Sequence, residues 1–289
     1  MSLALLLALA LNAQAADETS LWSRHAVGVG LYPSGAIVDS RIQVRTPMHR
    51  SESILFRDTY AGIGLRGAAS PAFVDIGPRI SLAPIDILDV DIQGSWHGYY
   101  GGPFGLLPYE EPGSKLSVVR DTRADEIVAA SAFTLSVAPT LKLKVGPIVA
   151  FDSWMVEAWS IQRPHDRTSE GERGGEIAED YVYEPYRDLV IGWRDVVVEH
   201  QAAVAYVLLP GEDGAKLWIG PTFRDRWATG SGDRSTALGA MVIWRPGTAT
   251  AVPTVVVQVL PYLRDADRVG RAPCIQAQVS WTLDDPVRR

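Results

Sequence analysis

The sequence predicts an all-β fold, a closed antiparallel transmembrane β-barrel of about 12 strands. Three observations predict it. Segments of roughly ten residues repeat along the chain, and within each of them every second residue is apolar. Turn residues separate the segments, and helical periodicity is nearly absent. Short and long connections alternate, as they do in barrels that cross an outer membrane.

The segment from Ile85 to His97 shows the alternation most plainly. Leu88, Val90 and Ile92 share one face of this predicted strand, while carboxylates such as Asp89 occupy the other face. The strand ends beside a cluster of aromatic residues. A strand that is apolar on one side and charged on the other suits a wall between lipid and water.

The first residues predict a secretory signal peptide. An apolar run from Leu3 to Leu11 precedes Ala13-Gln14-Ala15, a small-x-small cleavage pattern, although no Lys or Arg comes before the run. A buried N-terminal helix is the alternative, and it is disfavoured because the acidic residues Asp17 and Glu18 follow at once. The expected divisions are a signal peptide at 1–15, an N-terminal segment at 16–23, a barrel domain at 24–283 and a C-terminal tail at 284–289.

Composition excludes several classes of protein. After the signal, no stretch approaches the ~20 consecutive apolar residues that a membrane-spanning helix requires. The net charge of -7, with acidic and basic residues interspersed, provides no broad basic face for nucleic acid. The single cysteine, Cys274, forms no internal disulfide, and we expect it to be a small packing residue.

Alternation and turn residues together place the strands and their connections. The predicted strands span residues 24–32, 36–46, 54–66, 72–83, 86–98, 127–138, 140–156, 190–209, 215–228, 235–246, 251–263 and 272–283. The turns expected at the periplasmic end are 47–53, 83–84, 138–140, 210–214 and 245–248. Two long polar connections, 99–126 and 161–189, fall at the opposite end. Short inner turns, long outer loops and an even strand count are typical of outer-membrane barrels.

Tryptophan positions favour a membrane barrel over a soluble one. The residues in phase with the apolar face form two predicted aromatic girdles: Trp96, Trp159 and Trp227 at the outer ends of their strands, and Trp244 and Trp281 at the inner ends. Three others, Trp154, Trp193 and Trp218, fall out of phase. A soluble periplasmic ligand-binding barrel has the same alternation with its apolar side chains inside, so it stays an alternative.

An apolar-Gly-Pro motif recurs along the chain, at Ile76-Gly77-Pro78, Val145-Gly146-Pro147 and Ile219-Gly220-Pro221. We expect each copy to lie within a strand. Proline lacks a backbone donor, so these sites predict bends or bulges in which glycine relieves crowding on the concave face. The motif is interpreted as a device for closing the barrel rather than as a ligand site.

This layout resembles bacterial outer-membrane β-barrel proteins as a class, including the MipA/OmpV-like and porin-like families, in which Gly-Pro strands of this kind also occur. The resemblance covers nearly all of the mature chain and rests on architecture rather than on a diagnostic motif. It implies a Gram-negative outer-membrane location, contact with lipid and lipopolysaccharide, insertion by the barrel-assembly machinery and room for a homo-oligomer. Such barrels usually end on an aromatic residue, whereas here Trp281 is followed by several more residues.

The polar faces of the predicted strands supply the candidate lumen lining. It comprises Arg41, Gln43, Arg45, Asp75, Arg79, Asp89, Asp91, Gln93, His97, Lys142, Lys144, Asp152, Glu199, Arg224, Arg226, Gln276 and Gln278. Their charges nearly cancel. Two interpretations stay open: a lumen plugged by paired charges, and a selectivity lining in which a basic wall faces an acidic wall across a small aqueous pore.

The expected function is structural, or that of a narrow channel for small polar solutes, with no catalytic residue, metal or cofactor. The alternative is a membrane-embedded lipid hydrolase, because His49-Arg50-Ser51 matches the His-x-Ser pair of outer-membrane phospholipase A. That triplet falls in a predicted periplasmic turn, and asparagine, the supporting residue of that family, is absent after Asn12. No histidine spacing resembles a zinc site.

Overall fold

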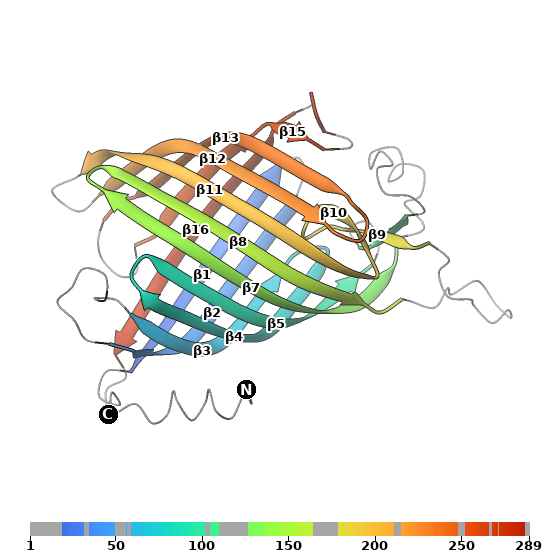
Figure 1. Ribbon diagram of the computed structural model, residues 1–289, viewed down its shortest axis with the longest axis horizontal. Coiled ribbons are helices and arrows are strands. Elements are labelled where there is room, and N and C mark those ends of the chain that lie inside the picture. Colours follow the sequence, from blue (N-terminus) through green and yellow to red (C-terminus); the bar gives the residue numbers. More distant parts are fainter. Residues whose placement is uncertain are drawn as a thin grey trace, which may run out of the picture.

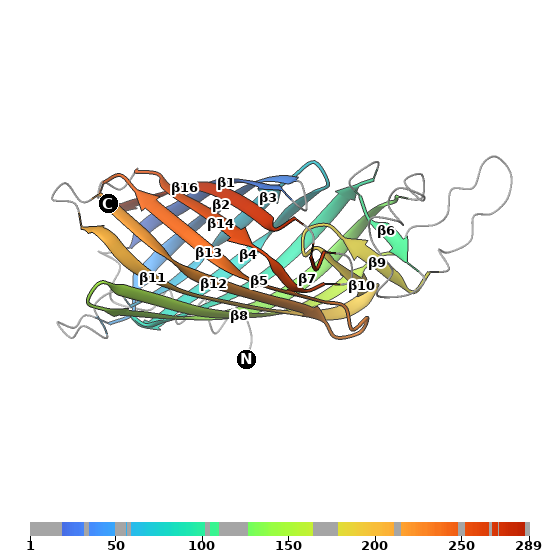
Figure 2. The same cartoon turned by 90° about the horizontal axis from the view of Figure 1, so that it is seen from above.

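The computed structural model shows a closed β-barrel with strongly tilted strands (Figures 1 and 2). The structure describes residues 19–31, 35–49, 56, 59–101, 105–109, 127–163, 179–210, 215–247, 252–265, 268–270 and 272–286. The predicted signal peptide at 1–15 lies outside the described residues. Within the described part of the chain, no helix is long and apolar enough to cross a membrane.

The wall strands follow the chain in order around the barrel. They are β1 (Ser20–Leu31), β2 (Gly35–Pro47), β3 (Tyr60–Ala69), β4 (Phe73–Ile85), β5 (Leu88–Tyr100), β7 (Ala129–Val145), β8 (Ile148–Ile161), β11 (Arg194–Pro210), β12 (Lys216–Ala228), β13 (Arg234–Arg245), β14 (Thr254–Leu260) and β16 (Cys274–Pro286). The short strand β15 (Tyr262–Arg264) continues β14 beyond Pro261 and pairs with β13.

Each wall strand pairs antiparallel with its neighbours, and the pairing of β1 with β16 closes the ring. That last ladder runs from Ser20 opposite Pro286 to Leu31 opposite Ile275. The two long connections, between β5 and β7 and between β8 and β11, lie at the same end of the barrel (Figure 1). The prediction of a closed antiparallel barrel of about 12 strands is therefore confirmed. We call the end with the short turns the periplasmic end.

Alternation separates an inner face from an outer face on every wall strand. On β4, Asp75 and Arg79 are buried inside, while Ile76 is 53% exposed on the outside. Phe133 and Leu135 of β7 are exposed to a similar degree. An apolar surface this extensive is unfavourable in water but matches the hydrocarbon core of a bilayer.

Two of the three Gly-Pro motifs lie within strands, as predicted. A Cβ atom on Gly77 would lie 1.8 Å from the backbone oxygen of Gly94, and one on Gly220 would lie 1.8 Å from that of Val204. At both motifs the pairing is interrupted on one side, towards β5 and β11, without any change of register. Glycine is therefore required there because a neighbouring backbone occupies the space of a side chain.

The third motif, Val145-Gly146-Pro147, lies at a turn rather than within a strand, and the turn predicted at 138–140 is wrong. β7 continues through Pro139 to Val145, and Gly146-Pro147 forms the turn to β8, with Gly146 at a φ of +57°. In this hairpin Val145 pairs with Ile148, so the two residues share a face. The faces of β8 are therefore the reverse of those expected for one continuous strand at 140–156.

Other boundaries differ by a few residues. β4 continues through Pro84 to Ile85, so the turn expected at 83–84 lies at 86–87. β1 starts at Ser20, within the expected N-terminal segment. β16 runs on to Pro286 because the backbones of Asp284 and Asp285 pair with β1, so part of the expected tail belongs to the wall.

Replacing the crowded glycines should destabilise the barrel. We expect Gly77→Ala and Gly220→Ala to lower the free energy of unfolding by roughly 2–4 kcal/mol, because the new methyl group meets a neighbouring backbone oxygen. The measurement is urea unfolding in lipid vesicles. Gly67→Ala is the matched control, since its Cβ would find only a carbonyl oxygen at 3.8 Å. Equal stability of all three variants would contradict this explanation of the motif.

Candidate functional site: a hairpin in the outer mouth of the barrel

The long outer connections hold a small sheet of their own. It consists of β6 (Leu107–Tyr109), β9 (Tyr181–Glu184) and β10 (Leu189–Gly192), in the order β10-β9-β6. Figure 2 shows these strands at the outer end of the barrel. The sequence predicted a long polar connection at 161–189 and a continuous strand at 190–209, and it did not predict that this region contains the short strands β9 and β10.

Apolar side chains dock the β9–β10 hairpin against the wall. Val182, Leu189 and Ile191 are at most 1% exposed, and they belong to one cluster with the inward-facing Phe73 and Tyr99. Full burial of each aliphatic side chain contributes about 1.5–3 kcal/mol. The hairpin is therefore a packed element of the barrel mouth.

The tip of the hairpin carries Arg187 into a buried cluster of charges. Its guanidinium lies 2.7 Å from Glu157 of β8 and 3.7 Å from Glu199 of β11. Arg226 of β12 lies 3.1 Å from Glu199 and donates a 3.0 Å hydrogen bond to the backbone carbonyl of Arg187. Two carboxylates and two guanidinium groups thus alternate around the tip, three of them from the wall.

Tyr186 makes a second anchor on the other side of the tip. Its hydroxyl accepts a 2.7 Å hydrogen bond from Arg66 of β3, and its ring lies 5.0 Å from that of Phe73. Arg66 is held in turn by Asp39 at 2.6 Å and Asp75 at 3.0 Å. Through this arginine of β3, the hairpin is linked to β2 and β4 as well.

Asp188 makes the third anchor. It has a φ of +59°, a left-handed conformation that aspartate tolerates better than most residues. Its carboxylate pairs with Arg268, which follows β15, through two hydrogen bonds, and accepts another of 2.7 Å from Tyr183. A bidentate Arg–carboxylate pair is strong and directional.

Glu184 lies at the base of the tip in a buried position. Its carboxylate accepts hydrogen bonds from the hydroxyl of Tyr99 at 2.9 Å, from the amide of Tyr186 at 2.8 Å and from the amide of Arg187. Burial raises the pKa of Glu184 to about 7, although these hydrogen bonds oppose the shift. The hairpin therefore contains a carboxyl group that titrates near neutral pH.

The hairpin does not fill the mouth completely. A cavity of about 560 Å³ lies between it and the wall formed by β1, β2 and β16. Small residues of β1 and β2, among them Gly28, Gly30 and Ala36, leave this space. Apolar residues and glycines form most of its lining, and the polar residues are Ser70, Tyr183, Tyr186, Asp188, Arg224, Arg226, Gln276 and Gln278.

Most of the lumen-lining residues expected from sequence lie on the inner face. Burial and cross-strand pairing place Arg41, Gln43, Arg45, Asp75, Arg79, Asp89, Asp91, Gln93, His97, Lys142, Lys144, Glu199, Arg224, Arg226, Gln276 and Gln278 there. Many form pairs. Arg79 lies 2.6 Å from Asp91, and Lys142 pairs with Asp89.

Asp152 is the exception, and its predicted place in the lumen is wrong. It pairs across the strands with Leu141, whose side chain is 51% exposed on the outer face. There Asp152 lies 2.6 Å from His200, whose ring stacks on Trp154 at 4.0 Å. The reversed faces of β8 explain this position.

Because the faces of β8 are reversed, two tryptophans lie on the opposite face from the one predicted. Trp159, expected in the outer girdle, is 3% exposed and turned inward, where it donates a hydrogen bond to Glu157. Trp154, expected to be out of phase, lies outside. The remaining girdle residues, Trp96, Trp227, Trp244 and Trp281, lie in phase with the outer face.

Other sequence expectations concern chemistry. Cys274 is fully buried and packs with Ala237, Leu260 and Tyr262, as expected of a packing residue. Ser51, which the hydrolase alternative requires, lies outside the described residues. Within the residues that the structure describes, no group of three or more His, Cys, Asp or Glu side chains could hold a metal ion.

Comparisons with known proteins return distant structural likenesses. The chain is similar to the β-domain of the Bordetella autotransporter BrkA, with 10% identity over 92% of this chain and 99% of that one, at a TM-score of 0.47. It is also similar to the NanC porin, with 10% identity over 93% and 100% at a TM-score of 0.41. The translocator domain of NalP from Neisseria meningitidis matches with 9% identity over 92% and 87% at a TM-score of 0.43. No protein-family model matches the chain, and no curated protein matches it.

Docking of the hairpin should depend on pH through Glu184. Because burial raises its pKa from 4.5 to about 7, the docked state holds its proton more tightly than a hairpin exposed to water. Docking should be strongest below about pH 4.5 and weaken as pH rises through 7, by about 3 kcal/mol in total. Hydrogen exchange of residues 181–192, corrected for the intrinsic rate, measures this.

Glu184→Gln serves as the control for that experiment. It retains the side-chain size and removes the titration, so exchange should become nearly independent of pH. An equal pH dependence in the wild type and in Glu184→Gln would show that another group is responsible.

Proposed function

We propose that this protein is a bacterial outer-membrane barrel that provides a narrow passage for small polar solutes, constricted at its outer mouth by the β9–β10 hairpin. The observation that carries the proposal is the cavity of about 560 Å³ beside the hairpin. Its lining combines guanidinium, carboxamide and tyrosine groups, which suit hydrated solutes. The apolar outer face and the closed ladder support the membrane location.

The charges of the passage favour anions. Arg224 contacts the amide oxygen of Gln276 at 3.4 Å, and Arg24 points into the lumen from β1. Among the described residues, neither arginine has a carboxylate within ion-pair distance. The acidic residues of the lumen, in contrast, are mostly paired with other arginines or with Lys142. An excess of unpaired positive charge lowers the barrier for an anion.

The ion pairs of the hairpin tip make the docked hairpin the resting state. Removing one partner from a buried pair costs about 3–5 kcal/mol because the other charge is left without compensation. The docked arrangement also explains why most lumen carboxylates have a basic partner. A purely structural barrel with a permanent plug has the same charge balance, so conductance decides between the two functions. Catalysis forms no part of the proposal.

Loosening the hairpin should widen the passage. We expect Arg187→Ala to raise single-channel conductance in planar bilayers several-fold, because the hairpin tip loses its ion pairs with Glu157 and Glu199 and docks less tightly. Arg234→Ala is the control, since Arg234 pairs with Asp225 on the outer face. If neither the wild type nor Arg187→Ala conducts, the channel proposal fails and the structural function stands.

Removing an unpaired lumen charge should alter selectivity. Arg224→Ala is expected to reduce the anion-to-cation permeability ratio to roughly half or less, because the passage loses a positive charge without freeing a carboxylate. The reversal potential in a KCl gradient measures the ratio, again with Arg234→Ala for comparison. An unchanged reversal potential would mean that ions do not pass beside Arg224.

A further inference from the structure

One part of the inner face is apolar, although the lumen of a membrane barrel is ordinarily polar. At the periplasmic end of β8, β11, β12 and β13, the inward positions hold Phe151, Ala203, Ala205, Trp218, Met241 and Ile243. The outward positions of the same strands are apolar as well, for example Val204 and Ile219. This stretch of wall is therefore apolar on both faces, and only the outer face is explained by lipid.

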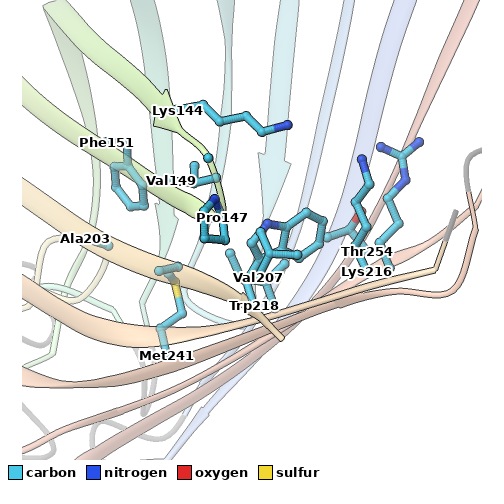
Figure 3. A pocket seen from close by; sticks show the side chains of 14 residues that line it. Lys144, Pro147, Val149, Phe151, Ala203, Val207, Lys216, Trp218, Met241 and Thr254 are labelled. Atoms are coloured by element: carbon cyan, nitrogen blue, oxygen red, sulfur yellow. The ribbon is translucent and has the colours of Figure 1, made fainter. Parts of the chain in front are cut away.

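These side chains line a chamber of about 630 Å³ that is separate from the cavity beside the hairpin. Figure 3 shows Trp218 in the chamber, with Phe151, Pro147 and Met241 around it. The volume falls within the ~300–1,000 Å³ range of small-molecule sites. An apolar surface facing a water-filled lumen is unfavourable unless a ligand covers it.

Two lysines stand at the edge of the chamber. Lys144 is the residue before the last of β7, Lys216 is the first residue of β12, and both line the chamber near the periplasmic turns (Figure 3). Among the described residues, neither has a carboxylate within ion-pair distance, whereas the nearby Lys142 pairs with Asp89. The chamber thus combines an apolar wall with three cationic groups at its periplasmic rim, because Arg245, which lies opposite Lys216 in the β12–β13 ladder, lines it as well.

We propose that this chamber binds a fatty carboxylate, with its alkyl chain along Phe151, Trp218 and Met241 and its carboxylate between Lys144 and Lys216. Burial of the alkyl chain supplies most of the affinity, because each methylene group gains free energy when it leaves water. The ammonium groups select an anionic head and fix its direction, towards the periplasm. The site does not depend on conduction through the hairpin region, because the two cavities have different linings.

The test is calorimetric titration of the full-length protein in lipid nanodiscs, with protein-free nanodiscs subtracted. Octanoate is the probe, and butyrate and 1-octanol are the comparators, since the first lacks the chain and the second lacks the charge. We expect octanoate to bind with a Kd below about 1 mM and both comparators to bind at least tenfold more weakly.

Variants test the binding of the alkyl chain and the binding of the carboxylate separately. The double variant Lys144→Gln/Lys216→Gln should weaken octanoate binding at least tenfold, and Ala205→Trp should abolish it by filling the chamber. Lys142→Gln, which removes a paired lysine outside the chamber, should bind as the wild type does. A heat-dependent gel shift verifies that each variant is folded.

Three outcomes would overturn the proposal. They are heats that do not exceed those of protein-free nanodiscs, octanoate binding that survives Lys144→Gln/Lys216→Gln unchanged, and equal affinities for octanoate and butyrate. If Ala205→Trp fails to fold, the proposal is still tested by the lysine variant, in which the apolar wall is unchanged, and by the comparators, which are titrated into the wild-type protein.

Discussion

The closing ladder between β1 and β16 is the interaction on which the rest of this structure depends. In lipid, each unpaired backbone N–H or C=O costs several kcal/mol, so a sheet can span the bilayer only when it has no free edge. The pairing from Ser20–Pro286 to Leu31–Ile275 removes that edge. Closure then fixes the strand number and tilt, and with them the width of the lumen. At Gly77 and Gly220 a neighbouring backbone approaches too closely for a side chain, so only glycine fits in the closed wall.

A lumen of this width brings the inward side chains of opposite strands within reach of one another. Charged groups in such a space need partners, and the wall alone does not provide all of them: Glu157 and Glu199 are joined by Arg187, which comes from the outer connection. Arg66 likewise needs Tyr186 in addition to Asp39 and Asp75. The hairpin is thus held by the same requirement that governs the wall, namely that buried polar groups be satisfied. Where it does not reach, two cavities remain: one beside the hairpin, lined by both polar and apolar residues, and one near the periplasmic end with a largely apolar wall.

Much of this architecture was predictable from the sequence because alternation with a period of two residues reports directly on which face is apolar. The strand positions and most of the lumen lining follow from it. The errors have physical causes. Gly146-Pro147 looked like the two motifs within strands, yet it forms a turn, and the misplaced turn reverses the predicted faces of the next strand, β8, as at Asp152, Trp154 and Trp159. The docked hairpin was missed because its contacts join positions far apart in the chain, such as Tyr99 with Glu184. The alternating apolar residues at Val182 and at Leu189 to Ile191 were the signal that could have revealed it.

Accessibility of the hairpin to a reagent added from outside tests the central claim most directly. Val182 is fully buried between the hairpin and the wall, whereas Arg264 is exposed at the outer end of β15. In a Cys274→Ala background, cysteine at each position would be exposed in turn to a membrane-impermeant maleimide on intact cells. The docked hairpin predicts rapid labelling of Arg264→Cys and strong protection of Val182→Cys. Labelling of both at similar rates would show that the hairpin lies outside the barrel mouth, and the constricted passage would have no basis.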